Sequence, residues 1–130
     1  MPSQTPTILF AENHVELAAT LAEQLARNRY VGQLRTMSEP ELKAVIDRIL
    51  RHCRDWSEGR EYELTACLDY LENICFVLSI ALAEVAYALY VVRDAIVDIL
   101  AADNQFESIE KIPQVKRFFE RLVRDLLRRY

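Results

Sequence analysis

The sequence predicts an all-α fold, a bundle of five helices. Only two of the 130 residues are glycine and four are proline, too few for the many tight turns of a small all-β protein. Hydrophobic residues make up 52% of the chain and charged residues 28%, which is the composition of a globular protein rather than a disordered or fibrous one. The length fits one helical domain over residues 1–130, with a polar leader over residues 1–7.

Two helices are expected in the first half of the chain. The first covers about residues 8–30, where apolar residues recur at helical spacing: Val15, Ala18, Leu21, Ala22, Leu25 and Ala26. The second begins at Ser38, because Ser38-Glu39-Pro40-Glu41 has the pattern of a capping box. In such a box the Ser38 hydroxyl accepts from a free backbone amide, and Glu41 reaches back to the amide of Ser38. Gly59 can end this helix in the left-handed conformation.

Between residues 60 and 112 there is no glycine or proline, and apolar residues alternate at spacings of four and three. This heptad seam consists of Leu64, Leu68, Leu71, Cys75, Leu78, Leu82, Val85, Leu89, Val92, Ile96 and Ile99. One helix over residues 60–102 would measure about 65 Å, which is long for a small domain. We therefore expect a break at residues 78–81, with Ser79 capping a new, antiparallel helix. Because the seam stays in phase, a single continuous helix remains the alternative.

A loop over residues 103–105 and a C-terminal amphipathic helix over residues 113–130 complete the prediction. The last helix follows Pro113, and its inward residues are Val115, Phe118, Phe119, Leu122, Val123, Leu126 and Leu127.

Charge and cysteine content restrict the function classes. The net charge of −4 and the pI near 5.2 argue against a nucleic-acid partner, which requires a basic surface. Charged residues interrupt the apolar stretch 74–102 too often for a membrane span, and no secretory signal opens the chain. We therefore expect a cytoplasmic protein. The odd count of three cysteines, without CxxC spacing, favours buried, reduced thiols.

Catalysis and metal binding find little support in the sequence. His14 and His52 are the only histidines, and the neighbours His52 and Cys53 point to different sides of a helix, whereas a zinc site needs three or four converging ligands. No nucleophile elbow or phosphate-binding glycine loop occurs. Asp94 and Asp98 share a helix face, but without Glu-x-x-His pairs they are interpreted as a solvated acidic face. The prediction is a protein without catalytic residues or cofactor. A haem-binding sensor globin with His14 or His52 as axial ligand stays open as an alternative.

Four residues form a candidate small-ligand pocket: Phe76, Tyr87, Tyr90 and Arg93. The competing interpretation is that the aromatic residues belong to the core or to an interface. Arg93 stands in an apolar stretch, so we expect it to pair with Glu72 or Asp69, or to face a partner protein.

The last helix carries a basic stripe, Arg117, Arg121, Arg124 and Arg128, at spacings of four, three and four. Such a stripe is typical of the solvated face of an amphipathic helix. It could also bind an acidic protein or nucleic acid, which makes an adaptor a further alternative function.

Three segments, residues 37–42, 82–85 and 89–96, together with Arg29-Tyr30, resemble the helical N-terminal domain of RsbT co-antagonists of the RsbR/RsbRD type. Those proteins act in bacterial stress signalling, and related segments precede some histidine kinases. The resemblance covers about residues 12–102. It implies an all-helical sensory or regulatory input module, sometimes globin-like without haem and often dimeric. The chain departs from the family in having Val77-Leu78-Ser79-Ile80 where a glycine commonly precedes the fourth helix.

The sequence as a whole therefore predicts a non-catalytic sensory or regulatory dimerisation domain of bacterial signal transduction. It would act through helix packing on a kinase or STAS-type partner. Because five helices carry more apolar residues than one bundle is expected to cover, we predict a homodimer. The predicted interface consists of Leu82, Val85, Leu89, Val92, Ile96, Phe119, Leu122 and Leu126.

Overall fold

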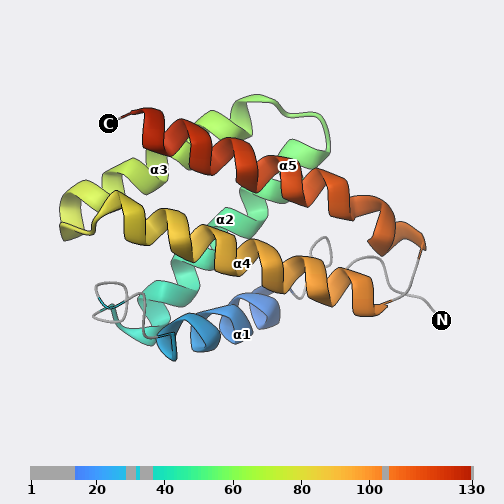
Figure 1. The fold of residues 1–130 in the computed structure, drawn as a ribbon, viewed down its shortest axis with the longest axis horizontal. Helices are drawn as coiled ribbons and strands as arrows, with labels where there is room; N and C mark the ends of the chain where they lie inside the picture. The colour runs from blue at the N-terminus through green and yellow to red at the C-terminus, as the bar shows by residue number, and fades with distance from the viewer. Residues whose placement is uncertain (1–13, 29–31, 33–36, 104–105, 130) are drawn as a thin grey trace.

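The computed structural model describes residues 14–28, 32, 37–103 and 106–129, and in this part of the chain the fold is all-α (Figure 1). Five helices follow one another without any strand in the described segments. They are α1 (His14–Ala26), α2 (Glu39–Ser57), α3 (Tyr62–Leu78), α4 (Leu82–Asp103) and α5 (Phe106–Arg128). The predicted fold class is confirmed.

The two longest helices form the centre of the bundle. Helices α4 and α5 run antiparallel and pack side by side, and α2 crosses behind them (Figure 1). Helix α1 packs on α2 and α4, while α3 packs on α2 and α5. Every helix therefore has one face against at least two others, which is how a bundle of amphipathic helices buries its apolar stripes.

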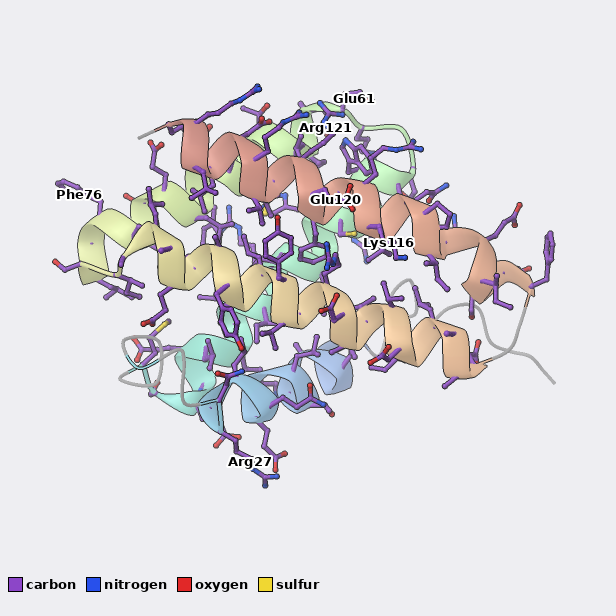
Figure 2. The ribbon with its side chains drawn as sticks, in the orientation of Figure 1. Arg27, Glu61, Phe76, Lys116, Glu120 and Arg121 are labelled. Atoms are coloured by element: carbon purple, nitrogen blue, oxygen red, sulfur yellow. The ribbon has the colours of Figure 1, made fainter. Side chains whose placement is uncertain are left out.

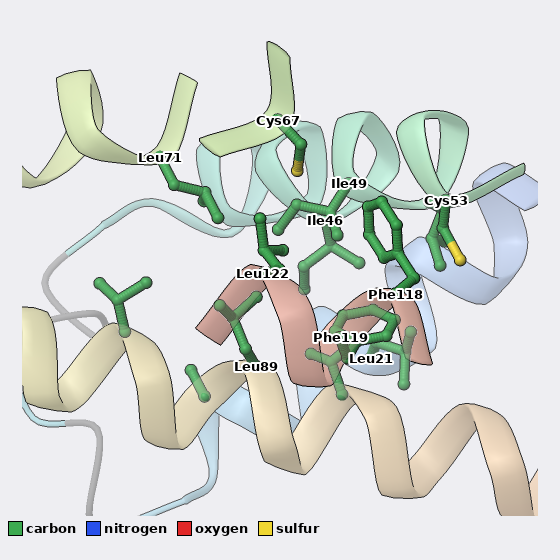
Figure 3. Packing of buried hydrophobic residues seen from close by; sticks show 14 of the residues in the cluster. Leu21, Ile46, Ile49, Cys53, Cys67, Leu71, Leu89, Phe118, Phe119 and Leu122 are labelled. Atoms are coloured by element: carbon green, nitrogen blue, oxygen red, sulfur yellow. The ribbon is translucent and has the colours of Figure 1, made fainter. Parts of the chain in front are cut away.

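A single hydrophobic core lies between the helices (Figure 3). Its largest side chains belong to α5, where Phe118 and Phe119 are completely buried and their rings meet edge to face with centroids 5.5 Å apart. Phe118 also contacts the ring of Trp56 on α2, at 5.6 Å between centroids. The contact between Phe118 and Trp56 joins α5 to α2. Helix α3 packs against both of these helices, so its position depends on how they pack together.

The predicted start and end of α2 are confirmed. The backbone N–H of Glu41 donates to Ser38 Oγ at 3.2 Å, and the N–H of Ser38 donates to Glu41 Oε1 at 3.0 Å. At the other end, Gly59 has φ +100°, a backbone conformation that side-chain-bearing residues rarely adopt. This turn directs the chain from α2 into α3.

The predicted break at residues 78–81 is confirmed, so the single long helix is excluded. Ser79 ends α3 with a left-handed backbone (φ 55°, ψ 41°), and the N–H of Ile80 donates to the carbonyl of Cys75 at 3.1 Å. The prediction that Ser79 caps the new helix is wrong, because α4 begins at Leu82 and Ala81 precedes it. Helices α3 and α4 run in opposite directions (Figure 1). Both pack on α5, but α3 also packs on α2 and α4 on α1.

Two other helix boundaries differ from the prediction. Helix α1 ends at Ala26 rather than at residue 30, and its predicted start at residue 8 lies outside the described residues. Helix α5 begins at Phe106, so the predicted boundary at Pro113 is wrong and the proline lies inside the helix. The first turn of α5 is held by a hydrogen bond from the buried Ser108 hydroxyl to Asp103, the last residue of α4. This anchor offsets part of the cost of a proline inside the helix, which removes one backbone hydrogen bond and crowds the carbonyl four residues earlier.

Of the predicted loop 103–105, residue 103 belongs to α4 and residues 104–105 lie outside the described residues. None of the described helices combines the length and apolarity needed to cross a membrane.

Candidate docking surface on helix α3

The residues predicted to form a dimer interface lie in the core of the single chain. Seven of them are at most 6% exposed: Val85, Leu89, Val92, Ile96, Phe119, Leu122 and Leu126. The eighth, Leu82, is partly buried and packs against the same core. The prediction of this interface is wrong, because α4 and α5 direct these side chains at each other and at the rest of the bundle rather than outward.

The predicted ligand pocket does not form either. Phe76 lies on α3 and faces a hollow shared with Asp69, Glu72, Asn73 and Arg129, whereas the other three pocket residues lie on α4. There, Tyr87 Oη accepts a hydrogen bond from Asn28 Nδ2 at 3.3 Å, and the Arg93 guanidinium lies 4.7 Å from the centroid of the Tyr90 ring.

The predicted partner of Arg93 is also wrong. Its guanidinium contacts Asp94 at 2.9 Å and Glu120 of α5 at 3.9 Å. The two carboxylates proposed for it, Asp69 and Glu72, instead lie 2.7 and 3.4 Å from Arg129 Nη1.

The last three residues of α3 are all apolar and all exposed. Phe76, Val77 and Leu78, here called the α3 tip, are 80%, 64% and 43% exposed. Figure 2 shows Phe76 pointing away from the bundle at the end of the helix. A run of three exposed apolar residues is unfavourable in water unless another surface covers it, and such patches mark interaction sites.

A groove lies directly beside the α3 tip. It has a volume of about 290 Å³, and Val77 and Leu78 form part of its wall. The remaining lining comes from α2, α3 and the residue before the capping box: Met37, Glu41, Ala44, Val45, Tyr70, Asn73 and Ile74. This volume is about ten times the share of one water molecule in the liquid, which is room for an aromatic side chain. The tip and the groove together are called the α3 surface.

Sequence reasoning named Phe76 but missed Val77 and the groove. Neither Phe76 nor Val77 belongs to the heptad seam, which passes through Cys75 and Leu78. Apolar residues outside the buried stripe, at the end of a helix, are the sequence signal that could have found this surface.

The geometry does not favour haem binding at His52. An apolar cavity between α1, α2, α3 and α4 has a volume of only about 40 Å³, room for little more than one water molecule. His52 lies elsewhere, with its Nδ1 at 2.5 Å from Glu63 Oε2. The side chain of His14 lies outside the described residues. In the described part of the chain, no three His, Cys, Asp or Glu side chains are grouped to hold a metal ion.

Intrachain contacts occupy part of the basic stripe on α5. Arg121 Nη1 lies 3.8 Å from Glu61 Oε2, and the two residues are labelled in Figure 2. The Arg121 guanidinium also lies 5.9 Å from the centroid of the Trp56 ring. Arg124 pairs with Asp125 at 3.3 Å, while Arg117 and Arg128 are exposed. Two of the four guanidiniums are therefore already paired with carboxylates, which weakens the case for the stripe as an adaptor surface.

All three cysteines are free and buried. Burial raises the pKa of the Cys53 thiol to about 12, and it raises the pKa of Cys67 and of Cys75 as well. Because the thiolate is the nucleophile, these side chains act as small apolar groups of the core.

No protein-family model, curated protein sequence or solved structure matches the chain. The resemblance to the RsbT co-antagonist domain therefore stays a prediction from the sequence, as does a globin-like arrangement of the helices.

Proposed function

We propose that this chain is a non-catalytic regulatory module of bacterial signal transduction that forms a homodimer through the α3 surface. The observation that supports it is the α3 tip, three consecutive exposed apolar residues beside an open groove. Covering apolar surface is the main driving force of protein association.

A second copy of the chain fits this surface because the α3 surface carries both halves of a contact. Phe76 projects outside the groove, and the groove beside it has room for an aromatic ring. In a two-fold dimer the same patch meets itself, so each copy would insert Phe76 into the groove of the other. A projecting residue and a receiving groove on one patch are what such a contact requires.

The charges around the α3 surface are arranged as the rim of an interface. Asp69 and Glu72 pair with Arg129 on one side, and Glu41 lines the groove on the other. Protein interfaces generally combine an apolar centre with a polar, solvated rim. In a two-fold contact, Arg129 of one copy would approach acidic residues of the other.

The regulatory part of the proposal rests on the sequence resemblance to sensory input domains over residues 12–102. A module of this kind transmits a signal as a shift in helix packing that a ligand or partner favours. The downstream partner would be a cytoplasmic kinase or STAS-type protein.

Analytical ultracentrifugation tests the dimer. We expect the protein to sediment as a dimer at tens of micromolar and Phe76→Asp to sediment as a monomer. Tyr62→Asp is the matched control, because Tyr62 is 67% exposed at the opposite end of α3. Since both residues are exposed, both variants should keep the helical content and thermal stability of the original protein.

A monomeric wild-type protein at tens of micromolar would overturn the proposal. So would a Phe76→Asp variant that dimerises as tightly as the wild type, or a Tyr62→Asp variant that loses the dimer equally.

A further inference from the structure

A polar hollow of about 330 Å³ lies where α2 approaches the start of α3, at the opposite end of α3 from the tip. Its lining is entirely charged or titratable: Arg48, Arg51, His52, Arg54, Asp55 and Glu63. Residues 48, 51, 52 and 55 recur at helical spacing, so they share one face of α2. This hollow is called the basic hollow.

His52 occupies the least exposed part of the basic hollow. Its side chain is 12% exposed and that of Glu63 is 13% exposed, and the two are joined by the 2.5 Å contact between Nδ1 and Oε2. Because an ionised carboxylate only accepts hydrogen bonds, Nδ1 carries the proton of this pair. Glu63 therefore fixes which ring nitrogen is left for another partner.

The other ring nitrogen of His52 has no partner. Nε2 is buried and makes no hydrogen bond within the part of the chain that the structure describes. A buried polar atom without a partner costs free energy, so a ligand that supplied one would recover that cost on binding. The free Nε2 is a hydrogen-bond acceptor in the neutral ring and a donor in the protonated ring.

Positive charge exceeds negative charge in the lining of the basic hollow. Three guanidiniums and two carboxylates line the basic hollow, although the whole chain has a net charge of −4. Arg51 pairs with Asp47 at 3.3 Å, outside the lining, and Arg54 pairs with Asp55 at 3.1 Å. An anion is the ligand that this imbalance favours.

Arg48 is the guanidinium best placed for a ligand. It lies 4.3 Å from the centroid of the Tyr70 ring, a cation–π contact that restrains its position. Among the described residues, no carboxylate lies within ion-pair distance of it. A guanidinium that is held against a ring and has no acidic partner is free to bind two oxygens of an anion through two of its N–H groups.

We propose that the basic hollow binds a small phosphate-bearing anion, with Arg48 and Arg51 on its oxygens. Because Nε2 of His52 is buried, the side chains that cover it move aside when a further oxygen of the anion binds to it. A phosphate group has enough oxygens to reach several donors at once, whereas a carboxylate has only two. Near neutral pH, part of the phosphate still carries one proton, and this O–H group can donate a hydrogen bond to Nε2 of the neutral His52 ring. Sulfate has the same shape and no such proton.

Fluorescence titration with inorganic phosphate tests the proposal. The only tryptophan, Trp56, lies one helical turn after His52 on α2 and is 9% exposed, so its emission reports on this region. At constant ionic strength and pH 7.5, we expect saturation with a Kd in the low millimolar range. Sulfate should bind more weakly. The ring resonances of His52, followed by NMR, should shift along the same curve.

Two variants and a control localise the binding. Arg48→Gln and His52→Gln should each weaken phosphate binding by about tenfold or more. Arg48→Gln carries the argument if His52→Gln fails to fold, because Arg48 is exposed. Arg27→Gln is the matched control, since Arg27 is an exposed arginine just after the end of α1 that pairs with Glu23 of that helix at 2.5 Å. It should leave binding unchanged.

The proposal is overturned if no saturable change occurs up to roughly 50 mM phosphate, an upper limit for specific binding of so small an ion. Equal affinity in Arg48→Gln, or equal affinity for sulfate and phosphate, would contradict it as well. None of these outcomes depends on the α3 surface, so this inference and the dimer can fail separately.

Discussion

Replacing Phe118 with alanine is expected to remove a large part of the stability of the bundle. The side chain is completely buried, its ring lies edge to face with Phe119, and it is tilted against Trp56 at 5.6 Å. Truncation of a buried phenylalanine costs about 3–5 kcal/mol through lost transfer free energy and the cavity left behind. Because two aromatic contacts are lost with the ring, we expect a cost near the upper end, about 4–5 kcal/mol.

The expected loss for Phe118→Ala is a large part of the total free energy of unfolding of a domain of this size. Single domains have free energies of unfolding of about 5–15 kcal/mol. A loss of 4–5 kcal/mol at this chain length corresponds to a decrease in Tm of roughly 15–20 °C. Urea denaturation followed by Trp56 fluorescence and by far-UV circular dichroism measures the cost. The same fluorescence should shift to longer wavelength in the folded variant, because water gains access to the indole.

Phe106→Ala is the matched control on the same helix. Phe106 is 76% exposed, so its truncation should change the free energy of unfolding by no more than about 0.5 kcal/mol. A loss below about 1 kcal/mol for Phe118→Ala would refute the packing of α5 on α2, which positions α3. Equal losses for the two variants would refute it too.

Three further changes test local features. Ser38→Ala should cost about 1 kcal/mol in urea denaturation, because it removes the hydroxyl that caps α2; an unchanged midpoint would contradict this role. Ser79→Gly should stabilise the chain by about 0.5–1 kcal/mol, because Ser79 has φ 55° and glycine adopts this backbone without strain; a lower Tm would contradict that reason. Finally, stability should fall above pH 9, by up to about 1.4 kcal/mol per pH unit for each buried thiol. Burial raises the pKa of Cys53 to about 12, so the unfolded chain releases protons that the folded chain retains. Urea denaturation between pH 7 and pH 10 measures this loss, which would be absent if Cys53 were accessible.

Local signals in the sequence predicted the parts of the fold that depend on few residues. The capping box at Ser38 and Glu41 involves four consecutive residues, and Gly59 acts through its own backbone, so both were found without knowledge of the rest of the chain. The start of α5 could not be predicted from neighbouring residues alone. The Ser108 hydroxyl and Asp103 meet only because the chain reverses between α4 and α5, and this contact allows helix to form before Pro113.

The hollow around His52 was beyond sequence reasoning for a similar reason. Arg48, Arg51 and His52 share a face of α2 that spacing alone could have identified. The contact to Glu63 arises from the angle at which α3 leaves the turn at Gly59, and no pattern in the sequence encodes that angle. The orphaned Nε2, on which the anion site depends, follows from this tertiary contact.

The dimer interface was misplaced because an apolar stripe identifies which residues are buried but not what buries them. Leu89 and Ile96 follow the heptad spacing of an intermolecular coiled coil, yet α5 of the same chain covers them. Intrachain packing has the advantage because a tethered helix has a far higher effective concentration than a second molecule. Apolar residues outside the stripe, such as Phe76 and Val77, cannot be covered in this way. They are therefore the better guide to where a second molecule binds.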